Sequence, residues 1–89
     1  MSEYEILLAA IREFGEKAQE EVAIEECSEL IQAITHKHRG REHNIPEEIA
    51  DVEIMLMQLK IINCCTREVK EIRDRKIARL LNRVRSDTE

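Results

Sequence analysis

The chain has 89 residues, of which 43% are hydrophobic and only 2% aromatic, and its 19 acids against 14 bases give a formal charge of −5. This composition lacks the basic face and the aromatic stacking platforms that nucleic-acid binding requires, so we expect no nucleic-acid partner. No apolar run approaches the roughly 18 residues of a membrane span, so we expect no membrane contact. The three cysteines show no paired spacing and the N-terminus is acidic rather than signal-like, which favours a cytoplasmic protein.

The spacing of apolar residues predicts four helices in a single all-α domain over residues 1–89, with its core at about 5–83. The first helix covers about 6–14, with Phe14 as its last apolar position, and is closed by Gly15. The second runs from Glu16 to Arg39, with Cys27 as a small core residue, and ends at Gly40. Few turn residues occur elsewhere, which is typical of a helical chain. We therefore expect a four-helix bundle-like fold that association with further copies completes.

The second half of the chain predicts two more helices. The third begins at Asn44 or Ile45, with Pro46 tolerated in its first turn, and breaks within residues 63–65. The fourth begins near Thr66, and we expect residues 86–89 to fray at its end. Its apolar positions are Val69, Ile72, Ile77, Leu80, Leu81 and Val84.

Four acids depart from the rule that charged side chains of a surface helix point away from its apolar stripe. In the third helix, Glu48 and Asp51 each lie within about 40° of Met55 on a helical wheel. In the second helix, Glu26 and Glu29 flank the apolar stripe, and their spacing of three residues points them the same way. Two carboxylate pairs are thus expected to face inward on adjacent helices.

Antiparallel packing of these helices would bring the four carboxylates together. Burial without compensation would cost on the order of several kcal/mol for each acid, or would force protonation. A hard divalent cation relieves both effects, and all-oxygen ligands suit Mg²⁺, Mn²⁺ or Ca²⁺ rather than zinc. The alternative is an ordinary helical core in which each acid pairs with Arg or Lys. A di-iron bundle is disfavoured, because none of His36, His38 and His43 follows a Glu by three residues.

The acids occur in two ordered motifs. The chain reads Glu25-Glu26-Cys27-Ser28-Glu29-Leu30 and, after the loop, Glu47-Glu48-Ile49-Ala50-Asp51-Val52. These motifs resemble those of the MazG-like, all-α nucleoside triphosphate pyrophosphohydrolases, which carry Glu-x-x-Glu and then Glu-x-x-Asp after a variable loop. The likeness covers roughly residues 5–83, nearly the whole chain.

The resemblance implies Mg²⁺-dependent attack of water at the α-phosphorus of a nucleoside triphosphate, which gives a monophosphate and pyrophosphate. Mn²⁺ is a possible substitute for Mg²⁺. Glu26, Glu29, Glu48 and Asp51 match the family's metal-ligand positions and are the expected catalytic residues. Glu25 matches the preceding Glu and is expected to support these ligands rather than to bind the metal.

The substrate-binding residues of the family are matched less completely. Family members often carry a Lys in the last helix and an Asn four residues later, near the substrate. Lys76 fits the first position, but Leu80 occupies the second and Asn82 is out of phase. Arg79 and Arg83 share a face with Lys76, so these three residues either meet phosphate groups or form a solvated basic face.

Members of this family commonly assemble as dimers or tetramers, which implies a homodimer or homotetramer here. The sequence favours association independently. A chain this short buries only about 60% of the surface that its unfolded state exposes, and Ile24 and Ile31 give the second helix apolar positions on more than one face. Two alternatives stay open. One is a non-catalytic, regulatory helical oligomer with the family fold, and the other is a pyrophosphohydrolase of another nucleotide such as phosphoribosyl-ATP.

Overall fold

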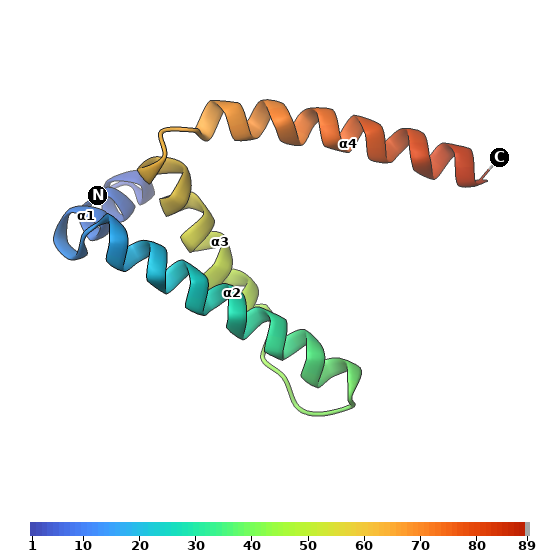
Figure 1. The fold of residues 1–89 in the computed structure, drawn as a ribbon, viewed down its shortest axis with the longest axis horizontal. Helices are drawn as coiled ribbons and strands as arrows, with labels where there is room; N and C mark the ends of the chain where they lie inside the picture. Colours follow the sequence, from blue (N-terminus) through green and yellow to red (C-terminus); the bar gives the residue numbers. More distant parts are fainter. Residues whose placement is uncertain (89) are drawn as a thin grey trace.

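The computed structural model describes residues 1–88 and contains four α-helices along the chain (Figure 1). These are α1 (Glu3–Phe14), α2 (Glu16–His38), α3 (Ile45–Ile62) and α4 (Thr66–Thr88). Residues 1–88 contain no strand, which confirms the predicted all-α class. Helix α4 reaches Thr88, further than the predicted fraying allows, and Glu89 lies outside the described residues.

The helix ends follow from local sequence chemistry. Gly15 ends α1 at a φ of 93°, a region that only glycine adopts without strain, and its N–H donates to the Ile11 carbonyl at 2.8 Å. At the other end of α1, Ser2 Oγ accepts from the Glu5 N–H at 3.1 Å, as an N-cap should. Pro46 lies in the first turn of α3, where a helix needs no N–H donor. The turn residues predicted from sequence therefore mark the observed boundaries.

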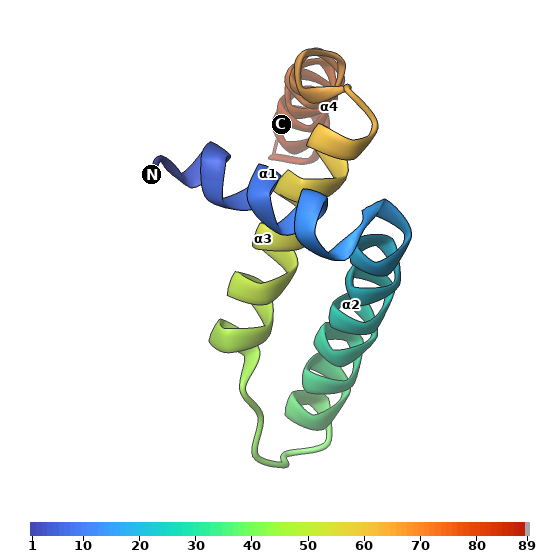
Figure 2. The same ribbon diagram turned by 90° about the vertical axis from the view of Figure 1, so that its left-hand side faces the viewer.

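Helices α2 and α3 form an antiparallel hairpin joined by the loop 39–44, and α1 crosses one end of it (Figure 2). The buried apolar residues come from all three helices: Leu7, Ile11, Ala23, Ala33 and Met55. Within residues 1–88, α4 packs only against α3 and extends away from the hairpin (Figure 1). The single chain is therefore a three-helix body with a projecting fourth helix.

Some residues of the predicted apolar stripes are exposed. Cys27, predicted to be a small core residue, is exposed in α2, and Phe14 at the end of α1 is 64% exposed. The core prediction for Cys27 was wrong, and Phe14 of the first apolar stripe is uncovered, because periodicity identifies an apolar side of a helix but not whether another element covers it. Along the described residues, no helix is both long enough and apolar enough to cross a membrane.

Core packing of α1 can be tested by one substitution at two positions of that helix. We expect Ile11→Ala, at a buried site, to lower the free energy of unfolding by about 2–5 kcal/mol, because it leaves a cavity. The matched control is Ile6→Ala at a site 54% exposed, with an expected change within about 0.5 kcal/mol. Urea denaturation followed by circular dichroism measures both, and equal losses would contradict the described packing of α1.

Candidate metal centre

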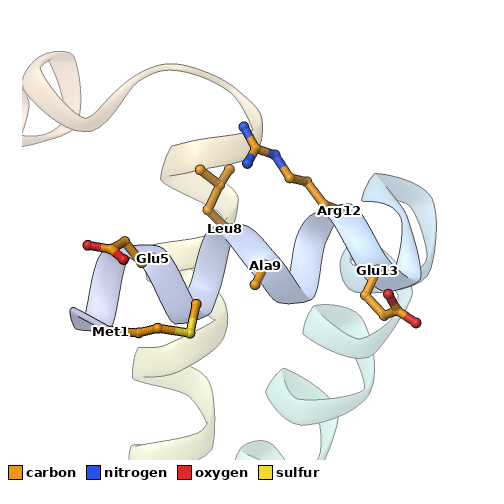
Figure 3. A pocket seen from close by; sticks show the side chains of 6 residues that line it. All are labelled: Met1, Glu5, Leu8, Ala9, Arg12 and Glu13. Carbon is orange, nitrogen blue, oxygen red and sulfur yellow. The ribbon is translucent and has the colours of Figure 1, made fainter.

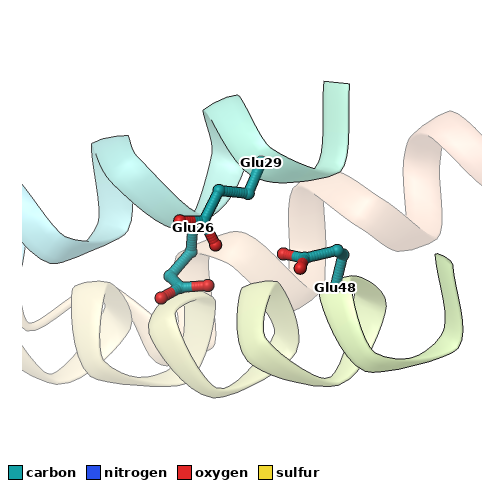
Figure 4. A group of neighbouring side chains, drawn as sticks. All are labelled: Glu26, Glu29 and Glu48. Atoms are coloured by element: carbon teal, nitrogen blue, oxygen red, sulfur yellow. The ribbon is translucent and has the colours of Figure 1, made fainter. Parts of the chain in front are cut away.

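Three of the predicted ligands converge at the seam of α2 and α3, where Glu48 is buried and Glu26 half-buried (Figure 4). Glu29 is exposed at the edge of this seam, so the prediction that it faces inward was wrong. Glu26 and Glu29 lie three residues apart on α2 and Glu48 lies in the first turn of α3, and one carboxylate oxygen from each falls within 4.8 Å of the others. Spacing by three residues places two side chains on one side of a helix, and the antiparallel hairpin supplies the third. These three acids form a group that could hold a metal ion, which we call the carboxylate cluster.

Glu48 is the most enclosed member of the carboxylate cluster, with only 6% of its surface exposed. Asn44, which precedes α3, donates from Nδ2 to Glu48 Oε1 at 2.7 Å. The other oxygen, Oε2, is buried and has no hydrogen-bond partner. A nearby amide therefore orients this side chain, while its other oxygen is buried without a hydrogen-bond donor.

Glu26 is half-buried, and its Oε2 also lacks a hydrogen-bond partner. Burial raises the pKa of Glu26, and repulsion from Glu29, Asp51 and Glu48 raises it further. A hydrogen bond with the Asp51 carboxyl, which needs a proton on one of the two groups, acts in the same direction. Asp51 thus lies beside the carboxylate cluster, next to Glu26.

The pKa of Glu48 is raised as well, chiefly by burial. Repulsion from Glu29, Asp51 and Glu47 adds to this effect, whereas the hydrogen bond from Asn44 opposes it. The groups that shift the pKa values of Glu26 and Glu48 are all acids apart from this one amide. Ion pairing with Arg or Lys, the alternative reading of the sequence, contributes to neither shift.

The arrangement fits a hard divalent cation. A buried carboxylate oxygen without a partner costs about 1–3 kcal/mol or more, and clustered like charges add repulsion. Mg²⁺ and Mn²⁺ prefer oxygen ligands and carry the opposite charge, so they would relieve both penalties. The residues present, with two unpartnered oxygens on Glu26 and Glu48, therefore suit Mg²⁺ chemically.

The remaining predicted site residues lie elsewhere in the single chain. Glu25 is exposed on α2, outside the carboxylate cluster. Lys76, Arg79 and Arg83 are exposed on α4, which packs only against α3 within the described part of the chain. Lys76 and Arg79 instead line a surface pocket of α4 together with Ile72 and Arg75.

Two polar residues, one beside Glu48 and one further along α3, are not identified as notable from the sequence. Asn44 was considered only as a helix start, although its spacing of four residues before Glu48 could have indicated the hydrogen bond. Gln58 is 5% exposed on α3, and its Oε1 is buried without a partner. Its place seven residues after Asp51, on the same side of the helix, was the available signal.

A second surface pocket lies on α1 (Figure 3). Its lining residues all come from the first 13 positions of the chain: Met1, Glu5, Leu8, Ala9, Arg12 and Glu13. They share no residue with the carboxylate cluster, which lies on α2 and α3. This pocket therefore adds no ligand or reactive group to the candidate site.

Comparisons of the chain with protein-family models, with curated proteins and with solved structures found no match. The class of the protein is therefore defined by its fold and by the carboxylate cluster. It is an all-α protein whose central hairpin carries a group of acids that could hold a divalent cation.

The raised pKa values predict how stability depends on pH without divalent cations. Between the ordinary glutamate value of 4.5 and the raised values, the folded protein binds more protons than the unfolded chain. Stability should therefore increase as pH falls through the raised pKa values toward 4.5, by linkage. Glu26→Gln should stabilise the metal-free protein at neutral pH and weaken this dependence, as measured by urea denaturation at several pH values.

The matched control for that measurement is Glu21→Gln, which removes an exposed charge from the same helix. We expect it to leave the pH dependence of the wild type in place, with a change in stability within about 0.5 kcal/mol. If Glu21→Gln and Glu26→Gln change the pH dependence of stability equally, burial of Glu26 among other acids is not the cause of that dependence.

Proposed function

We propose that this protein is a Mg²⁺-dependent nucleoside triphosphate pyrophosphohydrolase that converts a (deoxy)nucleoside triphosphate and water to the monophosphate and pyrophosphate. The observation that carries the proposal is the convergence of Glu26, Glu29 and Glu48, with Asp51 beside them, between two antiparallel helices. These four acids are the ones in the two motifs that resemble the MazG-like family. The resemblance supplies the reaction, and the geometry supports the metal.

The proposed chemistry assigns a role to each acid. Glu26, Glu29 and Glu48 would hold Mg²⁺, with Asp51 as a further ligand beside Glu26. When bound, Mg²⁺ would neutralise the triphosphate and lower the pKa of a coordinated water. The water oxygen bonds to the α-phosphorus, the bond from that phosphorus to the bridging oxygen breaks, and pyrophosphate leaves. The water proton passes to a carboxylate that the metal does not fully engage.

The substrate half of the site draws on α4. Lys76, Arg79 and Arg83 are exposed cations with the charge that a triphosphate requires, and α4 carries them away from the carboxylate cluster of its own chain. A homodimer or homotetramer would bring α4 of one copy against the hairpin of another. Association of this kind, a cytoplasmic location and the use of Mn²⁺ in place of Mg²⁺ belong to the same proposal.

One observation favours a second candidate, a non-catalytic helical oligomer. The basic residues of α4 lie apart from the carboxylate cluster in the single chain, and exposed apolar side chains on α2 and α4 suit association without chemistry. An assay across nucleotides separates the two candidates. It should include phosphoribosyl-ATP, because a different nucleotide substrate would otherwise look like inactivity.

We expect purified protein with Mg²⁺ to release pyrophosphate from at least one member of a panel of canonical and modified (deoxy)nucleoside triphosphates and phosphoribosyl-ATP. With H₂¹⁸O as solvent, mass spectrometry should find the label in the monophosphate, because water attacks the α-phosphorus. Glu29→Gln should lower turnover by about 100-fold or more, since it replaces a metal ligand. Glu53→Gln, an exposed acid on α3, should leave turnover near that of the wild type.

Three results would count against the proposed activity or against its metal ligands. They are no turnover on any substrate with either Mg²⁺ or Mn²⁺, label found only in pyrophosphate, and full activity of Glu29→Gln. The last result would reject the metal-ligand assignment while leaving the activity itself in place.

Metal binding can be measured without any substrate. A cation that binds only the folded state stabilises it by about 2.7 kcal/mol at a concentration 100 times its dissociation constant. Mg²⁺ or Mn²⁺ should therefore raise the melting temperature of the wild type and of Glu53→Gln, and should have little effect on Glu48→Gln. An equal rise in all three proteins would place the bound metal outside the carboxylate cluster.

A further inference from the structure

One side of the α2–α3 hairpin is apolar and exposed. A shallow groove there joins Ile24, Cys27 and Ile31 of α2 to Leu59 of α3. Leu59 also lines a second pocket near the start of α4, together with Leu56, which is 48% exposed. Ile24 is 69% exposed and Ile31 is 64% exposed, so nothing within residues 1–88 covers them fully. We call this surface, made by these five residues, the apolar face.

Helix α4 carries a second exposed apolar surface. Ile77, Leu80 and Leu81 are 56%, 51% and 47% exposed, and their spacing places them on one side of the helix. The 23-residue helix packs within the described chain only against α3. Most helices gain their stability from packing of the apolar side rather than from propensity. Packing of this stripe against another helix or subunit would therefore stabilise α4.

The junction between α3 and α4 keeps α4 away from the apolar face of its own chain. Asn63 donates its N–H to the Leu59 carbonyl at 3.0 Å, and Cys65 donates to the Lys60 carbonyl at 3.0 Å. Cys64 between them adopts a positive φ of 51°, which sets the change of direction. A three-residue connection fixed by these hydrogen bonds directs α4 outward (Figure 1).

Charge decides which surfaces can pair. Residues 66–88, which form α4, carry eight Lys or Arg and four Asp or Glu, a formal charge of +4. Residues 1–65 carry six Lys or Arg and fourteen Asp or Glu, a formal charge of −8. Pairing two α4 helices, or two hairpins, would place like charges together, whereas pairing α4 with a hairpin places opposite charges together.

We infer that the apolar face is the docking site for α4 of a second copy of this chain. Each copy places its stripe of Ile77, Leu80 and Leu81 on the apolar face of the other, which gives a two-fold symmetric dimer with both surfaces covered. Glu29 lies about 160° from Ile31 around α2, so docking leaves the carboxylate cluster open. The inference stands on the packing and charge of this chain and does not depend on the proposed activity.

Crosslinking tests the pairing directly. In a protein with Cys64→Ser, Cys65→Ser and Leu81→Cys, the remaining thiols are Cys27 on the apolar face and the new one on α4. A short bismaleimide should give a covalent dimer, and mass spectrometry of its peptides should find position 27 joined to position 81. The matched control carries Asn82→Cys in place of Leu81→Cys. Position 82 lies about 100° further around α4, so this protein should crosslink far less.

Solution size tests the same pairing without crosslinking. The wild type should be a dimer by light scattering, and Ile31→Glu and Leu80→Glu should each weaken dimerisation at least tenfold, because each buries a charge in the interface. Both positions are exposed in the single chain, so circular dichroism should still show helical protein. Weaker association at higher NaCl concentration is also expected, since screening reduces the attraction between opposite charges.

Several outcomes would overturn the inference. Crosslinks joining position 27 of one copy to position 27 of another would show that two apolar faces pair. A monomer at every concentration tested would remove the second copy as the occupant. A monomer that binds vesicles of phosphatidylserine and phosphatidylcholine, with binding lost in Leu80→Glu, would assign α4 to an anionic membrane surface instead.

Discussion

The arrangement of this protein depends on the burial of carboxylates at the α2–α3 seam without a base to pair with them. Glu48 is nearly enclosed and Glu26 is half-buried. Burial raises the pKa values of both residues, and repulsion from neighbouring acids raises them further. Such a seam is stable only if apolar contacts beside it, such as those of Ala33 and Met55, offset the penalty or if a cation or protons remove it. The seam therefore carries an energetic penalty that a bound cation or a proton would reduce.

The hairpin separates two kinds of chemistry onto different sides. The acids gather where Glu29 meets the seam, whereas the apolar face carries Ile24 and Ile31 on another side of the same helix. A helix can do this because consecutive residues are rotated by about 100°, so residues two apart point in nearly opposite directions. The carboxylate cluster and the apolar face therefore lie on different sides of the hairpin.

Much of the fold could be predicted from the sequence, because its signals are local. Gly15, Pro46 and the break at residues 63–65 act through backbone conformation over a few residues, and the structure places helix ends at each of them. Burial was predicted less well. Phe14 and Cys27 belong to apolar stripes and are nevertheless exposed, because their cover would have to come from an element that the single chain does not place there.

The sequence by itself determined four helices, their order, and the shared side of Glu26 with Glu29 and of Glu48 with Asp51, since these follow from a period of 3.6 residues. Only the tertiary structure decided which oxygens meet, that Asn44 orients Glu48, and that α4 projects from the body with its basic residues away from the acids. The reason is physical. Periodicity fixes the direction of a side chain around its own helix, whereas distances between helices depend on how the helices pack.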